Sequence, residues 1–163
     1  MQSERKKEKE YYEIVRSKLV DLLSTKFHEF HLEVTATKRF SNRLKAGIGQ
    51  YREIIFSFLK EAAPDITGFI TKEYSKDFIV VEVKRDRVKL DDIYQTRKYA
   101  ELFDARYALL ISQKEVPDEI KRLSRICSLL TIPAPRALTI VHYDQETGQF
   151  MEWFPSNPFE EQT

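Results

Sequence analysis

The chain has 163 residues, of which 42% are hydrophobic and 33% carry a charged side chain, and its formal net charge is +1. These values are typical of a globular protein with one compact core and exclude an intrinsically disordered chain. No run of 18 or more apolar residues occurs, so no membrane span is expected, and the N-terminus lacks the apolar core of a secretory signal. We therefore expect a cytoplasmic protein in which residues 1–163 form a single domain.

The first half of the chain predicts two helices separated by a strand. Apolar residues recur at helical spacing after a charged lead-in, and alternation between apolar and polar residues follows. Pro64 ends the second helix, because the residue before a proline disfavours the α conformation. The predicted elements are a frayed lead-in over 1–9, a helix over 9–24, a strand over 31–40, a loop at Gly47 and Gly49, and a helix over 51–63.

The second half predicts strands and helices in alternation. A polar loop over 72–77 joins the first two strands, and Asp91 and Asp92 favour a helix start that follows. Pro117 fits the first turn of a later helix. The predicted elements are strands over 66–71 and 78–84, a helix over 90–103, a strand over 106–112, a helix over 117–130, a hairpin of 137–143 with 149–154, and a loose tail from 155.

Basic side chains gather in two stretches although the net charge is close to zero. Such clusters fit a local nucleic-acid surface, while a plain solvated face is the commoner meaning of a run of charges. The first stretch holds Lys38, Arg39, Arg43, Lys45 and Arg52, and the second holds Lys84, Arg85, Arg87 and Lys89.

Cys127 is the only cysteine of the chain. It excludes an intramolecular disulfide and makes a cysteine-based zinc site improbable. Because Cys127 lies among apolar residues of a predicted helix, we expect it to be buried and inert.

The ends of the paired strands over 66–71 and 78–84 carry charges in an apolar setting. Side chains alternate along a strand, so Glu82 and Lys84 share one face of the second strand. In an antiparallel hairpin the start of one strand lies beside the end of the next, which places Asp65 near both. Buried charges of this kind need partners or a metal ion.

These residues suit metal-dependent cleavage of a phosphodiester. Asp65 and Glu82 offer oxygen ligands to Mg²⁺ or Mn²⁺, and the backbone carbonyl of Val83 offers another. The metal would polarise the phosphate and lower the pKa of a bound water. Lys84 would place a positive charge beside the phosphate and orient or activate the attacking water.

Pro64-Asp65 followed by Glu82-Val83-Lys84 resembles the PD-(D/E)xK signature of restriction-endonuclease-like nucleases. The stretch from Gln95 to Tyr99 resembles the Gln-xxx-Tyr motif of the RecB-like branch, and the two side chains lie on one helical face. Together these motifs resemble the N-terminal nuclease domain of type I restriction-enzyme motor subunits. The resemblance covers roughly residues 8–112 and implies an α/β, restriction-endonuclease-like fold with a mixed central sheet flanked by helices.

The resemblance also implies roles for individual residues. The family often adds an acidic metal ligand from the first helix; Glu13 is the candidate, with Glu10 and Glu53 as weaker alternatives. The implied catalytic residues are Asp65, Glu82, Lys84 and Gln95; the implied substrate contacts are Tyr99, Arg85 and Arg87; the implied metal ligands are Asp65, Glu82, Val83 and Glu13.

The expected function is therefore a Mg²⁺-dependent nuclease that acts on DNA. One alternative is a catalytically silent nucleic-acid-binding or assembly module of the same fold. Another keeps the chemistry but changes the substrate to RNA or to branched DNA, as in a Holliday-junction resolvase, which would be expected to form a two-fold homodimer. The region over 31–63 is expected to influence substrate choice.

Overall fold

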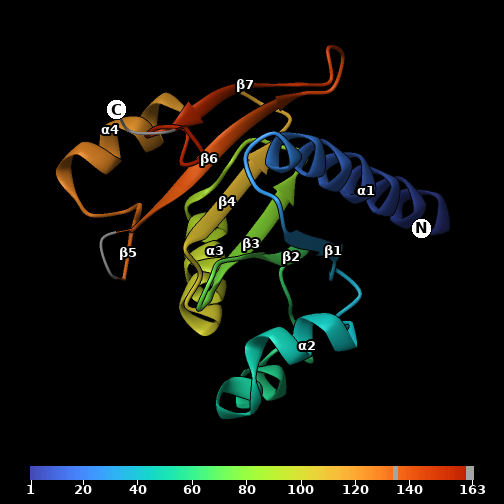
Figure 1. The fold of residues 1–163 in the computed structure, drawn as a ribbon. Helices are drawn as coiled ribbons and strands as arrows, with labels where there is room; N and C mark the ends of the chain where they lie inside the picture. The colour runs from blue at the N-terminus through green and yellow to red at the C-terminus, as the bar shows by residue number, and fades with distance from the viewer. Residues whose placement is uncertain (134–135, 161–163) are drawn as a thin grey trace.

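The structure is a computed structural model that describes residues 1–133 and 136–160 (Figure 1). The helices and strands follow one another in a mixed order along the chain. They are α1 (Gln2–Ser24), β1 (Phe30–Val34), α2 (Asn42–Ile48), the 3-10 helix η1 (Gln50–Phe58), β2 (Ile66–Thr71), β3 (Lys76–Lys84), α3 (Leu90–Phe103), β4 (Tyr107–Ser112), α4 (Asp118–Ile126), β5 (Thr131–Ile132), β6 (Arg136–Asp144) and β7 (Gln149–Phe154).

Seven strands form one mixed sheet in the order β1-β2-β3-β4-β6-β5, and β7 pairs with β6. β1, β2 and β3 are antiparallel neighbours, whereas β3, β4 and β6 run parallel. The connection from β3 to β4 contains α3, and the connection from β4 to β6 contains α4, because parallel neighbours need long crossovers. The predicted α/β class, with a mixed central sheet flanked by helices, is confirmed.

β3 is buried on both faces, because helices cover the sheet on two sides. Ile79, Val81 and Val83 pack in one core with Val15 of α1 and its neighbours. Val80 faces the other core, which contains the buried side chains of α3. Charged residues near the end of β3 are therefore surrounded by apolar packing on either face.

The predicted elements of the sheet centre agree with the structure to within two residues. β2, α3 and β7 have the predicted bounds, and β3, β4 and β6 start one or two residues from them. Shifts of this size are ordinary at element ends.

α1 begins at Gln2, so the prediction of a frayed lead-in over residues 1–9 is wrong. The lead-in is rich in Glu, Lys and Arg, which are good helix formers and extend the helix on its solvent side. Within the described part of the chain, no helix has both the length and the apolar character needed to cross a membrane.

The strand predicted over 31–40 is too long, because β1 ends at Val34. The next backbone N–H, that of Thr35, donates to the carbonyl of Asp65 at 2.8 Å and ties the two segments together. Lys38 then has a φ of 67°, a left-handed conformation that no strand accommodates.

The connection from β1 to β2 differs most from the prediction. Gly47 was expected in a loop but lies inside α2, whose N-cap residue Ser41 accepts a hydrogen bond from a backbone N–H of the first turn. Gly49 does end α2, with a φ of 80°. The helix predicted over 51–63 is a 3-10 helix that ends at Phe58.

The helix predicted over 117–130 extends only from Asp118 to Ile126. Leu129 and Leu130 are buried but follow the helix and lead into β5, which the sequence pattern did not predict. Cys127 is exposed at the helix end, so the prediction that it is buried is wrong.

The tail from residue 155 is packed and not loose over the residues that the structure describes. Phe159 is buried, and its ring stacks on Tyr107 with 4.6 Å between the ring centroids. Residues 161–163, which the same prediction included, lie outside the described residues.

Replacing Gly68 by alanine is expected to destabilise the protein severely. Gly68 lies opposite Leu32 in the β1–β2 pairing, and a Cβ atom there would lie 1.9 Å from the carbonyl oxygen of His31. We expect a loss of more than about 3 kcal/mol in the free energy of unfolding, measured by urea denaturation. Gly47→Ala is the control, since its Cβ would meet only side-chain atoms, of Phe69 at 3.1 Å and of Lys76 at 3.4 Å, and no backbone atom within 3.4 Å. Similar stabilities for the two variants would contradict this packing.

Candidate functional site

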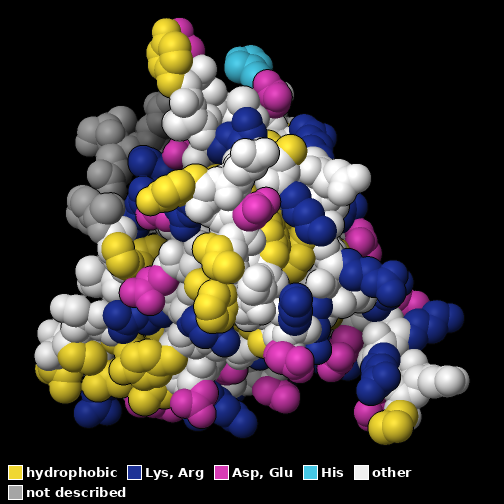
Figure 2. Space-filling model, turned by 90° about the horizontal axis from the view of Figure 1, so that it is seen from below, with side chains coloured by type: hydrophobic (Ala, Val, Ile, Leu, Met, Phe, Trp, Pro, Cys, Tyr) yellow, Lys and Arg dark blue, Asp and Glu magenta, His cyan; other side chains and the backbone are white. Residues whose placement is uncertain are grey.

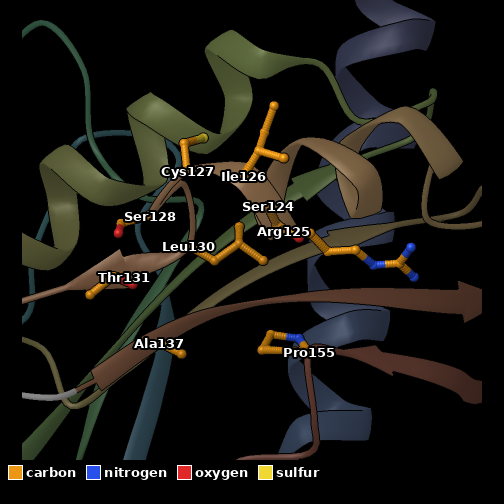
Figure 3. A pocket seen from close by; sticks show the side chains of 9 residues that line it. All are labelled: Ser124, Arg125, Ile126, Cys127, Ser128, Leu130, Thr131, Ala137 and Pro155. Atoms are coloured by element: carbon orange, nitrogen blue, oxygen red, sulfur yellow. The ribbon is translucent and has the colours of Figure 1, made fainter.

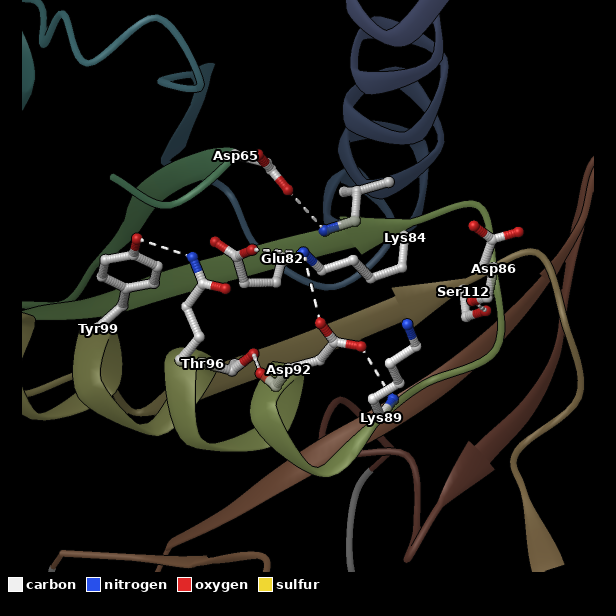
Figure 4. Close-up of polar contacts among 11 residues, drawn as sticks. Asp65, Glu82, Lys84, Asp86, Lys89, Asp92, Thr96, Tyr99 and Ser112 are labelled. Carbon is white, nitrogen blue, oxygen red and sulfur yellow. Dashed lines mark hydrogen bonds and ion pairs between the residues drawn. The ribbon is translucent and has the colours of Figure 1, made fainter. Parts of the chain in front are cut away.

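The start of β2 is joined to the end of β3 through the carboxylate of Asp65. Ile66 pairs with Val81, so Asp65 lies beside the last residues of β3. Its Oδ2 accepts a hydrogen bond from the backbone N–H of Val83 at 2.8 Å (Figure 4). The predicted proximity of Asp65 to the end of β3 is present in the structure.

Glu82 is a buried acid with an unsatisfied oxygen. The residue is 3% exposed, and its Oε1 has no hydrogen-bond partner among the described residues. Its other oxygen, Oε2, lies 3.7 Å from Nζ of Lys84. Unpaired buried carboxylate oxygens are costly, so Oε1 is free to accept a further hydrogen bond or ligand contact.

Lys84 lies between two carboxylates from different elements. In addition to Glu82, its Nζ lies 3.5 Å from Oδ1 of Asp92 on the first turn of α3. Oδ2 of Asp92 accepts the backbone N–H of Lys89 at 2.9 Å, so helix capping fixes this carboxylate (Figure 4). The sequence assigned Asp92 only to the helix N-terminus; its contact with Lys84 required the packing of α3 on β3.

Gln95 and Tyr99 form the contact that their spacing predicts. The Gln95 side-chain amide donates to the Tyr99 hydroxyl at 3.2 Å. Tyr99 is 0% exposed, so in the free protein it has no surface for the expected substrate contact. Its hydroxyl instead orients Gln95.

The two acids of the site have strongly raised pKa values. Burial, the largest cause, raises the pKa of Asp65 to about 6, against the hydrogen bond from Val83 and the charge of Lys84. Burial followed by the charge of Asp65 raises the pKa of Glu82 to about 8. The pKa of Lys84 is also raised: burial lowers it, but Glu82, Asp92 and Asp65 outweigh burial. The site therefore holds two buried acids with raised pKa values beside one ammonium whose pKa is also raised.

The acid that α1 directs to this site is Glu8 and not Glu13. Glu13 forms an exposed ion pair with Arg16 at 2.9 Å, and Glu10 lines a different hollow. Glu8 lines the hollow above the site together with Tyr12, and its charge contributes to the raised pKa of Asp65. Glu8 is four residues before Tyr12 and shares its helical face. The prediction overlooked it because the helix was expected to begin at Lys9.

Glu53, the remaining alternative, lies on η1 and lines a separate hollow. Of the two predicted basic contacts, Arg85 is half-buried in the hollow above the site. Arg87 also lines this hollow but is bound to Glu119. The hollow has a volume of about 270 Å³ and is lined by Glu8, Tyr11, Tyr12, Val83, Lys84, Arg85, Asp86, Arg87, Lys89 and Asp92.

A divalent cation fits the donors of this site in part. Among the described residues, no group of three or more His, Cys, Asp or Glu side chains is arranged to hold a metal ion. Asp65 and Glu82 alone offer two carboxylates, one with an unsatisfied oxygen. This set suits Mg²⁺, which keeps several of its waters and binds through one or two protein carboxylates.

A second hollow, of about 420 Å³, lies beside the end of α4 and has a different lining (Figure 3). None of its lining residues is acidic, and Arg125 is its one charged residue. The lining consists of Ser124, Arg125, Ile126, Cys127, Ser128, Leu130, Thr131, Ala137 and Pro155. It therefore lacks the paired acids that mark the site at the end of β3.

No protein-family model, no curated protein and no solved structure matches the chain at a significant level.

Replacing Glu82 by glutamine is expected to change how stability depends on pH. The folded pKa of about 8 lies above the ordinary value of 4.5, so the folded protein keeps a proton that the unfolded chain releases. The free energy of unfolding therefore falls as the pH rises from about 4.5 to about 8. At pH 8 we expect the free energy of unfolding of Glu82→Gln to exceed that of wild type by on the order of 4 kcal/mol, and to lose this advantage near pH 4.5.

Urea denaturation across this pH range measures the difference. Glu13→Gln is the control, since Glu13 is exposed in its pair with Arg16. If the free energy of unfolding depended on pH in the same way in wild type and in Glu82→Gln, the raised pKa of Glu82 would be contradicted.

Proposed function

We propose that the chain is a divalent-metal-dependent nuclease of the PD-(D/E)xK type, with a restriction-endonuclease-like fold and DNA as its substrate. The observation that supports this most is the meeting of Asp65, Glu82 and Lys84 at the end of β3, where Oε1 of Glu82 has no partner among the described residues. A structural ion pair does not need a second buried acid with a raised pKa. Phosphodiester cleavage with a divalent cation uses all three groups.

The proposed metal ligands are Asp65, Glu82 and the backbone carbonyl of Val83. Glu8 replaces Glu13 as the acid from α1, acting across the hollow that both it and Val83 line. When bound, a divalent cation supplies Lewis-acid activation of the phosphate and of a water molecule.

Lys84 supplies a fixed positive charge beside the scissile phosphate. Because Glu82, Asp92 and Asp65 raise its pKa, it stays protonated at neutral pH and serves as a cation and hydrogen-bond donor rather than as a base. Asp92 holds the ammonium, and Tyr99 holds the amide of Gln95 toward the same site. Arg85 and Arg87 are proposed to contact backbone phosphates, which position a nucleic acid without reading its sequence.

A silent nucleic-acid-binding module is the second candidate. It is favoured by the finding that no cluster of three or more metal-ligating side chains occurs among the described residues. RNA and branched DNA are the alternative substrates, and a homodimer is the assembly that a junction resolvase would need. Metal binding and cleavage separate these candidates.

Mg²⁺ or Mn²⁺ is expected to raise the melting temperature of the wild-type protein at pH 8. A ligand at about a hundred times its dissociation constant adds about 2.7 kcal/mol of stability when it binds only the folded state. Asp65→Asn with Glu82→Gln should abolish this effect, since both carboxylates are removed. Glu13→Gln should keep it, because Glu13 pairs with Arg16 outside the site. An equal metal effect in all three proteins would refute the assignment of the ligands.

Cleavage is expected on DNA in the presence of Mg²⁺ or Mn²⁺. Asp65→Ala and Lys84→Ala should each reduce the rate by about 10²- to 10³-fold, as losses of a key electrostatic or proton-transfer group do. The assay compares single-stranded, duplex and branched DNA with RNA, and Asp91→Asn, an exposed neighbour of Asp92, is the control. Cleavage that persists in both alanine variants would exclude this site. Metal-independent binding without cleavage of any substrate would favour the silent module.

A further inference from the structure

The connection between β1 and β2 forms a separate projection, residues 38–60, which we call the arm. It contains α2 and η1 and extends below the sheet in Figure 1. Leu44, Ile48, Ile55 and Leu59 are the buried apolar side chains of the arm. The arm also leaves several large apolar residues in solvent.

Three large apolar side chains of η1 face solvent. Tyr51 is 97% exposed, Ile54 is 63% exposed and Phe58 is 69% exposed. Tyr51 and Ile54 are three residues apart in a 3-10 helix, so their side chains lie one above the other. Both line an open hollow of about 520 Å³ with Lys45, Gln50, Glu53, Phe56 and Ser57. Exposed apolar side chains that are grouped in this way mark interaction sites.

The same arm carries positive charge with little compensation. Between residues 38 and 52 there is no Asp or Glu, and the exposed cations of this stretch are Lys38, Arg39, Arg43 and Lys45. Glu53 is the first acid that follows. Figure 2 views the molecule from the side on which α2 lies, and it shows hydrophobic side chains among Lys, Arg, Asp and Glu side chains on that face.

Arg52 anchors the arm to the helix that forms the site. Its guanidinium donates to the carbonyl of Leu102 at 2.6 Å and lies 3.6 Å from Asp104. Leu102 is two turns beyond Gln95 on α3, which corresponds to on the order of 10 Å along the helix axis. A polymer that extends from the site along α3 would therefore need to span a distance of this order to reach the arm.

We propose that the arm binds an unpaired segment of nucleic acid, with phosphates on the cations and bases stacked on Tyr51 and its apolar neighbours. This inference rests on the proposed nuclease function and names its substrate class as strands with unpaired bases. Base faces are open to an aromatic ring only where pairing is absent, and cationic grooves with exposed aromatic side chains are typical of single-strand binding. A second copy of the chain is a poor occupant, because two acid-poor cationic surfaces would repel each other.

Fluorescence anisotropy in EDTA tests the arm without cleavage. A labelled single-stranded DNA, its RNA counterpart and the corresponding DNA duplex are titrated with wild type and variants. Wild type should bind either single strand more tightly than the duplex. Tyr51→Ala should weaken single-strand binding about tenfold and duplex binding much less, because one stacked base is lost. Arg43→Glu with Lys45→Glu should weaken all binding and reduce its dependence on salt.

Two controls match these changes elsewhere on the surface. Tyr74→Ala removes a tyrosine that is 91% exposed in the β2–β3 turn. Arg122→Glu with Arg125→Glu reverses two exposed charges on α4. Neither control should change the preference for single strands.

The proposal is overturned if Tyr51→Ala binds single strands as wild type does, or if wild type prefers the duplex. It is also overturned if light scattering finds that the wild-type protein is a dimer and that Tyr51→Ala is a monomer. These results are separable from the nuclease proposal. Tyr51-dependent binding without metal-dependent cleavage would support strand binding by the arm and refute catalysis. Cleavage with unchanged binding by Tyr51→Ala would support catalysis and refute strand binding by the arm.

Discussion

The hydrogen bond from the Val83 N–H to Asp65 organises the candidate site. It holds the start of β2 against the end of β3, and the Asp65 carbonyl in turn accepts the Thr35 N–H that ends β1. Its consequence is electrostatic, because it fixes one buried acid beside another. Burial then raises the pKa of Asp65, and burial together with the charge of Asp65 raises the pKa of Glu82. The ends of β2 and β3 therefore hold two buried acids close together, which is unfavourable when both are charged.

The positive charge of Lys84 partly compensates the charges of these acids. The position of its ammonium depends on α3, which carries Asp92. Asp92 is held by the first turn of α3, and Gln95 is held one turn later by the buried Tyr99. The helix thus presents side chains whose own positions are determined by capping and burial. Fixed polar groups of this kind are what catalysis by preorganised charge requires. This rigidity fits the proposed nuclease and contrasts with the solvent-exposed side chains of the arm.

The proposed site and the arm differ in how far their charges are removed from water. At the end of β3, a few charges are strong because they are removed from water. On the arm, cations and apolar side chains remain in water, where the cations would attract a polyanion with little sequence dependence. Arg52 connects the two regions through the end of α3. A strand held on the arm would be concentrated at the site.

The sequence by itself determined the sheet centre and the proximity of Asp65 to the end of β3. Alternation of side chains and antiparallel pairing are local rules, and they place Glu82 and Lys84 on one face. The Gln95–Tyr99 contact follows equally from helical spacing. Only the tertiary structure decided that Glu8 and not Glu13 lies over the site, that Asp92 contacts Lys84, and that Gly47 is helical. Those outcomes depend on how α1, α3 and the arm pack against the sheet, and contacts between distant segments have no local pattern.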